Sequence, residues 1–369
     1  MKIEMVLPGL IYAGMETVVA QLTQDLARRG HDVGITCIEF EGPLGEKLRG
    51  DGVRLTLVPA PGLRTIPFPT QLVRWFATLR PDVVHAHSGA WLKAARAAHL
   101  ACVPRVVHTV HGLDDPEPWY DPLLMWWAAL YTSAIAAVSD PLADYLKRVA
   151  HVPSGRIHVV PNGVDTDRFR PGPKQGILRT RYALEPHACV FGHVGRLVPV
   201  KNHALLFKAF ERVLKKHPHI ALVLIGDGVL RASLEELARQ LGIDRRVHFF
   251  GETSDPSALY REFDAFLLPS LAEGTSMSVL EAMATGLPVV GSAVGGTPAL
   301  LAHGEAGLLV PPNDAHALAA ALDTIVSNAE IRRQLGLKAR HRAVSHYSHE
   351  HVASRYERLY AASTTCPAN

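Results

Sequence analysis

The chain has 369 residues, a length that suits two domains of ordinary size, each able to bury its own core. Its composition, 48% hydrophobic and 20% charged, is that of a folded protein and excludes a disordered one. The formal net charge of +3, with no long run of Lys or Arg, argues against a dedicated nucleic-acid-binding protein.

The four cysteines are widely scattered and form no C-x-x-C pair, which indicates a reducing compartment. We therefore expect a cytoplasmic protein, with the inner face of the plasma membrane as a second expectation. The N-terminus carries Glu4 inside its apolar run and no cleavage site, so it predicts a first strand and no signal peptide. The cysteines are Cys37, Cys102, Cys189 and Cys366.

The first half of the chain alternates apolar strands with helices, which predicts a parallel sheet covered on both faces. Ligands bind such sheets beyond the carboxyl ends of the strands. The predicted strands are residues 3–7, 33–38, 53–58, 83–85, 105–108, 134–138 and 157–160, and the predicted helices are 15–29, 70–79, 91–100, 123–130 and 142–149.

Two stretches of this half raise the question of a membrane. Residues 122–138 carry no charge, but Tyr131-Thr-Ser133 interrupts them and a span needs about 20 apolar residues. We predict a helix and a buried strand there, and no transmembrane segment. Residues 68–80 mix aromatic and basic side chains, which is typical of a core helix with a solvated edge. Docking of this helix on a membrane surface is the minority hypothesis.

Glycine and histidine follow several of the predicted strands. Gly14 lies in a turn that leads into a helix, and we expect close backbone approach to a ligand there. The segments His85-Ala-His87 and His108-Thr-Val-His111 follow later strands, although a lone histidine is more often packed than catalytic. Asp165-Thr-Asp167 lies in a turn-rich stretch that ends the alternation, so we predict a structural role for it and no metal site.

The second half of the chain restarts the alternation. Arg196 and Lys201 straddle a strand-to-helix turn, which is a suitable position for cations that meet a diphosphate. A solvated loop pair is the other interpretation of these two residues. The predicted strands are residues 189–194, 221–225, 247–251 and 265–270, and the predicted helices are 203–216, 230–241 and one that Gly286-Leu-Pro288 ends.

The segment from Glu273 to Glu281 carries the strongest functional signal. The residues Thr275, Ser276 and Met277 lie at a predicted helix start, where free backbone N–H groups and the helix dipole favour an anion. The two carboxylates beside this start are good acceptors for sugar hydroxyls. Phosphate and sugar together predict a nucleotide sugar. On spacing alone, however, two such glutamates are ordinarily a cap and a solvated face.

The run E-G-T-S-M-S-V-L-E-A-M-A-T-G-L-P-V-V from Glu273 resembles, without gaps, the signature of glycosyltransferase family 4. Many members have Gly-Phe-Gly after the first glutamate, where this chain has Gly-Thr-Ser. The segment Thr-x-His-Gly around His111 resembles the active-site histidine of the family, and Gly-Arg-Leu-x-x-x-Lys-Asn resembles its diphosphate-binding stretch. The resemblance also implies that the loops at Gly226 and Gly251 lie against the nucleotide.

The resemblance implies an α/β protein of the GT-B fold, with two Rossmann-like domains and a ligand cleft between them. Residues 1–170 would be the N-terminal, acceptor-side domain and residues 171–345 the C-terminal domain that binds the nucleotide sugar. Residues 346–369 would be a helix and tail that cross back to the N-terminal domain. The His349-Glu-His351 pattern on this last helix predicts a solvated face and no metal site, because residues two apart do not share a helix face.

The implied activity is that of a retaining, metal-independent glycosyltransferase without a resident cofactor. It would move a sugar from a UDP- or GDP-linked donor to a glycan or lipid-linked acceptor, in the synthesis of cell-surface polysaccharide or glycoconjugate. Arg196, Lys201 and the helix start would stabilise the leaving diphosphate. Glu281 would bind the ribose, Glu273 would orient the donor sugar, and His111 would contact the sugar or the acceptor. No nucleic-acid partner is expected.

Three alternatives remain open from the sequence. Another GT-B activity, such as a nucleotide-sugar epimerase, would rearrange the donor sugar instead of transferring it. A noncatalytic nucleotide-sugar-binding subunit would bind nucleotide without turnover. A dehydrogenase is least favoured, because no strand runs into G-x-G-x-x-G with an acidic residue about 20 residues further on.

Overall fold

A computed structural model of the protein describes residues 1–11, 14–60, 62, 65–66, 68–112 and 120–362. The chain divides into two compact units, unit 1 (Met1–Asn162 with His349–Asn369) and unit 2 (Gly163–Ser348). Cys366 and the last residues of the predicted tail lie outside the described residues.

The division between the units differs from the predicted boundaries at 170 and 345 because residues 164–169 are fastened to unit 2. The backbone N–H of Val164 donates to the carbonyl of Tyr347 at 2.8 Å. Arg340 Nη1 donates to the carbonyl oxygens of Thr166 and Phe169, each at 3.0 Å. The turn-rich stretch that follows the first sheet is therefore already part of the second unit.

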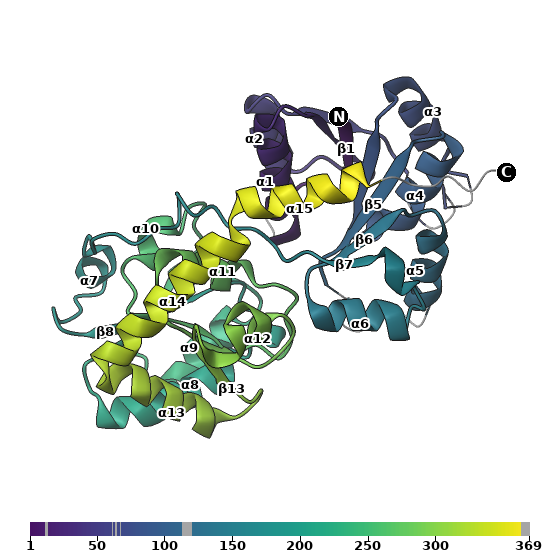
Figure 1. Ribbon diagram of the computed structural model, residues 1–369. Coiled ribbons are helices and arrows are strands. Elements are labelled where there is room, and N and C mark those ends of the chain that lie inside the picture. The colour runs from purple at the N-terminus through teal and green to yellow at the C-terminus, as the bar shows by residue number, and fades with distance from the viewer. Residues whose placement is uncertain (12–13, 61, 63–64, 67, 113–119, 363–369) are drawn as a thin grey trace. The chain divides into compact units, whose positions relative to one another are not determined.

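Unit 1 is built on a parallel sheet of seven strands in the order β3-β2-β1-β4-β5-β6-β7, with helices on both faces (Figure 1). Strands β4 and β5 each extend two residues beyond their predicted ends, so His87 and Thr109 belong to the sheet. The strands are β1 (Lys2–Leu7), β2 (Asp32–Cys37), β3 (Arg54–Leu57), β4 (Val83–His87), β5 (Arg105–Val110), β6 (Ala134–Ala137) and β7 (Ile157–Val159), and the helices are α1 (Gly14–Arg28), α2 (Pro43–Gly50), α3 (Thr70–Leu79), α4 (Trp91–Leu100), α5 (Asp121–Leu130), α6 (Asp140–Arg148) and α15 (His349–Ala361).

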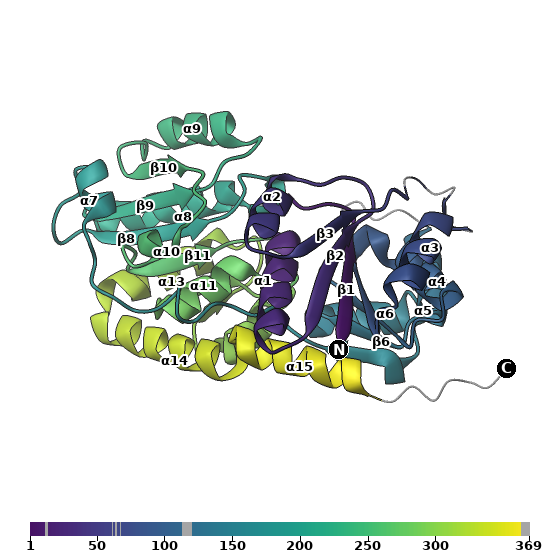
Figure 2. The same ribbon diagram turned by 90° about the horizontal axis from the view of Figure 1, so that it is seen from above.

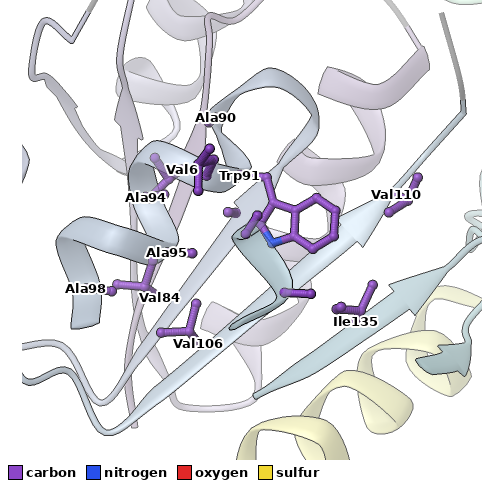
Figure 3. Close-up of a cluster of buried hydrophobic side chains, with 14 of the residues drawn as sticks. Val6, Val84, Ala90, Trp91, Ala94, Ala95, Ala98, Val106, Val110 and Ile135 are labelled. Atoms are coloured by element: carbon purple, nitrogen blue, oxygen red, sulfur yellow. The ribbon is translucent and has the colours of Figure 1, made fainter. Parts of the chain in front are cut away.

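One face of this sheet is packed around Trp91, at the start of α4 (Figure 3). Its indole ring stacks on His108 with ring centroids 4.0 Å apart, and its Nε1 donates to Thr132 Oγ1 at 2.9 Å. The alanines of α4 that face the strands are fully buried, because small side chains let the helix lie close to the sheet.

The opposite face of the sheet is covered in part by α15, the last helix among the described residues, which packs beside α1 (Figure 2). Tyr356 and Tyr360, one turn apart on α15, are both buried in this core. Longer-range bonds fasten the helix; among them, Arg29 pairs with Glu357 at 2.7 Å, and Arg105 Nε donates to the carbonyl of Leu359 at 3.0 Å. Helix α15 is therefore an integral part of unit 1.

Unit 2 is built on a second parallel sheet, with strand order β10-β9-β8-β11-β12-β13. Its apolar strands are buried, and helices lie along both faces. The strands are β8 (Cys189–Val194), β9 (Ile220–Ile225), β10 (Val247–Gly251), β11 (Ala265–Leu268), β12 (Val289–Ser292) and β13 (Leu308–Val310), and the helices are α7 (Ile177–Arg181), α8 (His203–Lys216), α9 (Arg231–Gln240), α10 (Ser257–Tyr260), α11 (Met277–Thr285), α12 (Thr297–Leu300), α13 (Ala315–Ser327) and α14 (Ala329–Tyr347).

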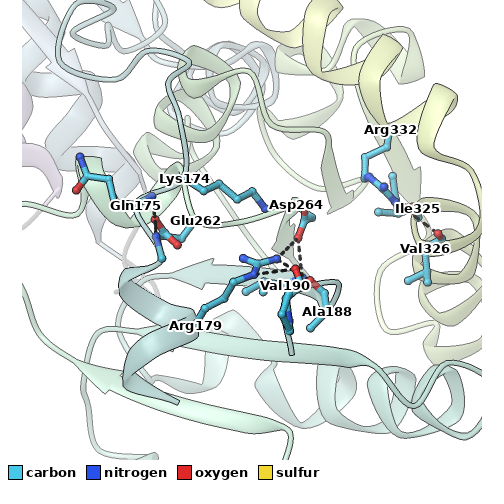
Figure 4. A network of polar contacts seen from close by, with 12 residues as sticks. Lys174, Gln175, Arg179, Ala188, Val190, Glu262, Asp264, Ile325, Val326 and Arg332 are labelled. Carbon is cyan, nitrogen blue, oxygen red and sulfur yellow. Dashed lines mark hydrogen bonds and ion pairs between the residues drawn. The ribbon is translucent and has the colours of Figure 1, made fainter. Parts of the chain in front are cut away.

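A polar network holds the segment that leads into the second sheet (Figure 4). Glu262 Oε1 accepts the backbone N–H groups of Gln175 and Gly176 at 2.6 and 3.0 Å. Asp264 accepts from Lys174 Nζ at 2.6 Å and from the backbone N–H of Val190 at 2.8 Å. These bonds fix residues 174–176 against the starts of β8 and β11.

The two stretches that raised the membrane question form α5 with β6, and α3. Among the described residues, no helix is both long enough and apolar enough to span a bilayer. In α3, Phe76 is buried in the core and Trp75 Nε1 donates to Thr36 Oγ1 at 3.0 Å, whereas Arg74 and Arg80 are exposed. The interpretation of this segment as a core helix with a solvated edge is therefore confirmed.

Candidate functional site

The strand order of unit 2 reverses between the neighbours β8 and β11, and such a reversal is where open α/β sheets bind ligands. Lys201 lies in the loop after β8, and Glu273 lies in the loop after β11. Their side chains form an ion pair, with Lys201 Nζ 2.6 Å from Glu273 Oε1. The side chains are 18% and 9% exposed, respectively. The fold thus brings together two predicted site residues from distant parts of the sequence.

The carboxylate of Glu273 has a second donor. Ser270 Oγ donates to the same Oε1 at 2.6 Å, so the carboxylate is held in one orientation by two bonds. The loop after β12 supports its backbone. Gly295 has φ +53°, and a Cβ atom at this position would overlap the carbonyl oxygen of Glu273. The close approach of this second loop therefore requires glycine.

The start of α11, next to Glu273 in the chain, has backbone donors without a side-chain cap. Ser276 is its N-cap residue, but the hydroxyl lies 3.2 Å from Ser278 Oγ and makes no capping bond. Thr275 and Ser276 are buried, and Met277 is the first residue of the helix. A helix start of this kind suits an anion, because its first N–H groups point out of the helix.

Glu281, on α11, is held by a residue that lies outside the motifs described above. Tyr260, at the end of α10, donates its hydroxyl to Glu281 Oε2 at 2.7 Å. Burial raises the pKa of Glu281 to about 7, although the bond from Tyr260 opposes this shift. Tyr260 lies on a four-residue helix outside every recognised motif, so no local pattern in the sequence indicates its role.

The loops after β8, β9 and β10 contact one another through backbone atoms. Gly226, which follows β9, has φ +126°, and a Cβ atom there would overlap the carbonyl oxygen of Gly195. Its N–H donates to the carbonyl of Gly251 at 2.8 Å. The predicted nucleotide-contacting glycines, Gly226 and Gly251, are therefore neighbours in the fold.

Among the described residues, no hydrogen bond or ion pair joins the side chain of Arg196 to Lys201 or Glu273. The Arg196 side chain is exposed and makes no hydrogen bond or ion pair with the described residues. The following residue, Leu197, is buried, and its N–H donates to the carbonyl of Asp227 at 2.9 Å. The backbone of this loop is therefore anchored, and the guanidinium is accessible.

In unit 1 the strand order reverses between β1 and β4, and predicted residues again follow strands near that position. Gly14 begins α1 and is exposed, and a Cβ atom there would contact nothing in the chain. His111 follows β5, and its Nε2 lies 3.1 Å from His87 Nδ1. Burial lowers the pKa of His111 to about 4. His87 lies in a predicted strand-end segment, but no pattern in the sequence indicates its contact with His111.

Two segments, Asp165-Thr-Asp167 and His349-Glu-His351, were predicted not to bind a metal ion. Asp165 Oδ1 accepts the backbone N–H groups of Asp167 and Arg168, which is the structural turn that was predicted. In the described part of the chain, no group of three or more His, Cys, Asp or Glu side chains is arranged to hold a metal ion. His349 departs from the expected solvated face, because it is half-buried and lies 3.7 Å from the carboxylate of Asp25.

Comparison with known proteins gives matches along most of the chain. Residues 12–168 match the family model described as Glycosyltransferase Family 4, and residues 178–342 match the one described as Glycosyl transferases group 1. The chain is 31% identical over 320 residues to the UDP-Gal:alpha-D-GlcNAc-diphosphoundecaprenol alpha-1,3-galactosyltransferase of Escherichia coli, covering 82% of each protein. It is 33% identical to a D-inositol 3-phosphate glycosyltransferase of Actinosynnema mirum, covering 87% of this chain and 86% of that one.

The fold is also similar to solved structures. The crystal structure of the Anabaena protein HepE in complex with UDP superposes with a TM-score of 0.85 at 21% identity, over 97% of this chain and 99% of that one. The two sheets and the matched regions define an enzyme of the GT-B class of glycosyltransferases. The chain belongs to glycosyltransferase family 4, the group 1 glycosyltransferases, whose activity uses nucleotide-sugar donors.

Proposed function

We propose that the protein is a retaining, metal-independent glycosyltransferase that uses a UDP-linked sugar and a glycan or lipid-linked acceptor. The observation that carries this proposal is the Lys201–Glu273 ion pair beside the uncapped start of α11, at the strand-order reversal of unit 2. It combines a cation, backbone donors and an oriented carboxylate at the place where α/β sheets bind ligands.

In this proposal the positive charge that a metal would otherwise supply comes from the protein. Lys201, the accessible guanidinium of Arg196 and the N–H groups at the start of α11 stabilise the diphosphate as it leaves. Preorganised donors of this kind are worth most where charge develops in the transition state. Glu273 orients the donor sugar, and His111 contacts the sugar or the acceptor.

The ribose is assigned to Glu281. Tyr260 holds Oε2 of this carboxylate at 2.7 Å, which fixes the direction in which the carboxylate accepts further bonds. An ionised carboxylate can accept a hydrogen bond from each of the two ribose hydroxyls. A protonated carboxyl has a proton on one of these acceptor oxygens, so we propose that the ionised form of Glu281 binds the nucleotide.

The choice of UDP and of a lipid-linked acceptor is supported by the relatives. The Escherichia coli relative is named for UDP-Gal and for a diphosphoundecaprenol acceptor, and the Anabaena protein was crystallised with UDP and with UDP-glucose. Helix α5 offers a surface consistent with peripheral membrane contact. Leu123, Trp126 and Leu130 lie along one side of this helix and are 60%, 43% and 52% exposed. We therefore propose a role in cell-surface polysaccharide or glycoconjugate synthesis, at the inner membrane face.

The first experiment is a thermal-shift panel with UDP, GDP and ADP, each with and without EDTA. We expect UDP to stabilise the protein by about 2.7 kcal/mol at a hundredfold excess over Kd, with no effect of EDTA and no shift in Glu281→Ala. Incubation of a labelled UDP-sugar with a prenyl-diphosphate-linked sugar then tests transfer. Rearranged donor in place of product would favour an epimerase, and binding without turnover would favour a noncatalytic subunit.

A second prediction concerns pH. Because the pKa of Glu281 is raised to about 7, we expect the Kd for a UDP-hexose to fall as the pH rises from 6 to 8. Each pH unit below 7 weakens binding by up to about tenfold, since the carboxyl must first lose its proton. A UDP-hexose is preferable to UDP because UDP has a terminal phosphate that titrates in the same range. Calorimetry should show proton release on binding at pH 6.5, and Glu281→Gln should abolish the dependence. A pH-independent wild-type Kd would contradict the assignment.

A further inference from the structure

His87 and His111 of unit 1 are joined directly through their imidazole rings. His87 Nδ1 lies 3.1 Å from His111 Nε2, and the ring centroids are 5.3 Å apart. His87 pairs with Thr109 in the parallel register of β4 and β5, so these two side chains lie on the same face of the sheet. His111 is two residues beyond Thr109, and side chains two apart along a strand point to the same face, so His111 lies on that face as well. The other nitrogen of each ring, His87 Nε2 or His111 Nδ1, is buried and has no partner among the described residues.

The direction of the hydrogen bond follows from where the protons can be placed. Burial lowers the pKa of both rings, so each imidazole is neutral at pH 7 and carries one N–H. One of the two protons lies between the rings. The ring that donates this proton has an unprotonated outer nitrogen, which is an acceptor, and the ring that accepts it carries its own proton on the outer nitrogen, which is a donor. Both outer nitrogens are buried, but His87 as a residue is only 1% exposed, whereas His111 is half-buried. A ligand can therefore approach the ring of His111 and not that of His87. Orphaned buried N–H groups are rarer than unpaired buried acceptors. His87 Nδ1–H is therefore the donor to His111 Nε2, and His111 carries its own proton on Nδ1.

We propose that His87 is a positioning residue, which holds His111 as the Nδ1–H tautomer and makes that N–H available to an oxygen of the sugar. The hydrogen bond that one imidazole nitrogen makes decides which nitrogen carries the proton. This inference rests on the proposed function, in which His111 contacts the sugar or the acceptor. His87 itself contacts neither the sugar nor the acceptor and acts through His111.

The orientation of His87 is itself supported from α15. The ring of His85 lies against that of His87, with centroids 4.1 Å apart. His85 is fixed on both nitrogens, with Nδ1 2.8 Å from Tyr360 OH and Nε2 2.8 Å from Thr109 Oγ1. His87 is therefore packed against a ring that cannot turn without breaking two hydrogen bonds.

The tautomer is tested by ¹⁵N NMR of histidine-labelled protein, with His111 assigned by its loss in His111→Gln. We expect a protonated Nδ1 and an unprotonated Nε2 on His111 in the wild type. In His87→Leu the proton should return to Nε2, the preferred position in a free imidazole. The variant Tyr360→Phe removes the bond to His85 but keeps the His87–His111 pair, so it should retain the wild-type tautomer. An unprotonated Nδ1 in the wild type, or unchanged shifts in His87→Leu, would overturn the proposal.

Kinetics separate positioning from a general loss of structure. We expect His87→Leu to lower kcat roughly 10–100-fold, as misplacement of a catalytic group does, with an unchanged Kd for UDP, whose contacts are assigned to unit 2. His87→Asn places an amide near the position of Nδ1 and should recover part of the rate. The matched variant His158→Asn, at an exposed histidine of β7, should behave as wild type.

A wild-type kcat in His87→Leu, or equal impairment of the Leu and Asn variants, would overturn the proposal. An inactive wild type would instead refute the proposed function, and the NMR result would still decide the tautomer.

Discussion

We expect Lys201→Met to lower kcat for sugar transfer by about 10²–10³-fold, the largest single effect on activity among the site variants. The loss of one preorganised donor to developing charge costs about 2.7–4 kcal/mol of transition-state stabilisation in comparable sites. The substitution also removes the cation that lies 2.6 Å from Glu273, whose side chain is 9% exposed. Steady-state kinetics with a saturating acceptor would measure the change.

Two further variants separate the role of Lys201 in catalysis from its role in holding Glu273. Lys208→Met, at an exposed lysine of α8, the helix that follows Lys201, is the matched control and should retain wild-type kcat. The double variant Lys201→Met/Glu273→Gln removes the unpaired charge, so it should recover stability lost by the single variant but no activity. Recovery of kcat in the double variant would show that the ion pair is structural and would remove Lys201 from the proposed mechanism.

The largest expected effect on stability comes from Gly295→Ala. Its positive φ of +53° alone costs an L-residue about 1–2 kcal/mol. Overlap of the new Cβ atom with the carbonyl oxygen of Glu273 adds about 1–3 kcal/mol, since the packed loop must move. We also expect weaker binding of the nucleotide sugar, because the segment that moves carries Glu273. Urea denaturation, followed for the transition of unit 2, would measure the first effect and calorimetry the second.

Gly242→Ala is the matched control for this variant. Gly242 also has a positive φ, +66°, but a Cβ atom there would contact nothing within 4 Å. It should therefore cost only the backbone strain and leave nucleotide-sugar binding unchanged. Equal losses of stability in the two variants would mean that the contact between Gly295 and Glu273 has no energetic importance.

The sequence predicted best those elements whose ends coincide with changes in local pattern. The predicted bounds of α3, α4, β8, α8 and β10 are those of the structure, because apolar periodicity and flanking turn residues define them. Helix α2 was not predicted, because Gly42-Pro43 and Gly45 are residue types that ordinarily indicate a loop. Proline at the first position of a helix is in fact compatible with the helical backbone.

The strands β4 and β5 were predicted too short for a related reason. Polar residues at the ends of a strand are usually exposed, but Thr109 and His87 are buried and bonded to side chains from elsewhere in unit 1. Their burial is favourable only because the fold supplies those partners. No pattern within the strand itself reveals them.

The candidate site shows the same limit. Lys201 and Glu273 were recognised separately from motifs, and the structure brings them into contact. Tyr260 and the His87–His111 bond were not foreseen, because each joins residues from different elements across the fold. Sequence reasoning identified the residues that resemble a family pattern, whereas the residues that orient them depend on tertiary contacts that the local pattern does not encode.

The place of α15 in unit 1 has a consequence for the order in which the protein folds during synthesis. The chain leaves the ribosome from its N-terminus, at about 5–20 residues per second. All of unit 2 is made before residues 349–361 emerge, although unit 1 begins first. Unit 2 therefore has its complete set of residues earlier. Until residues 349–361 emerge, the apolar surface of the nascent first sheet that Val352, Tyr356 and Tyr360 later cover stays open to water or to a chaperone.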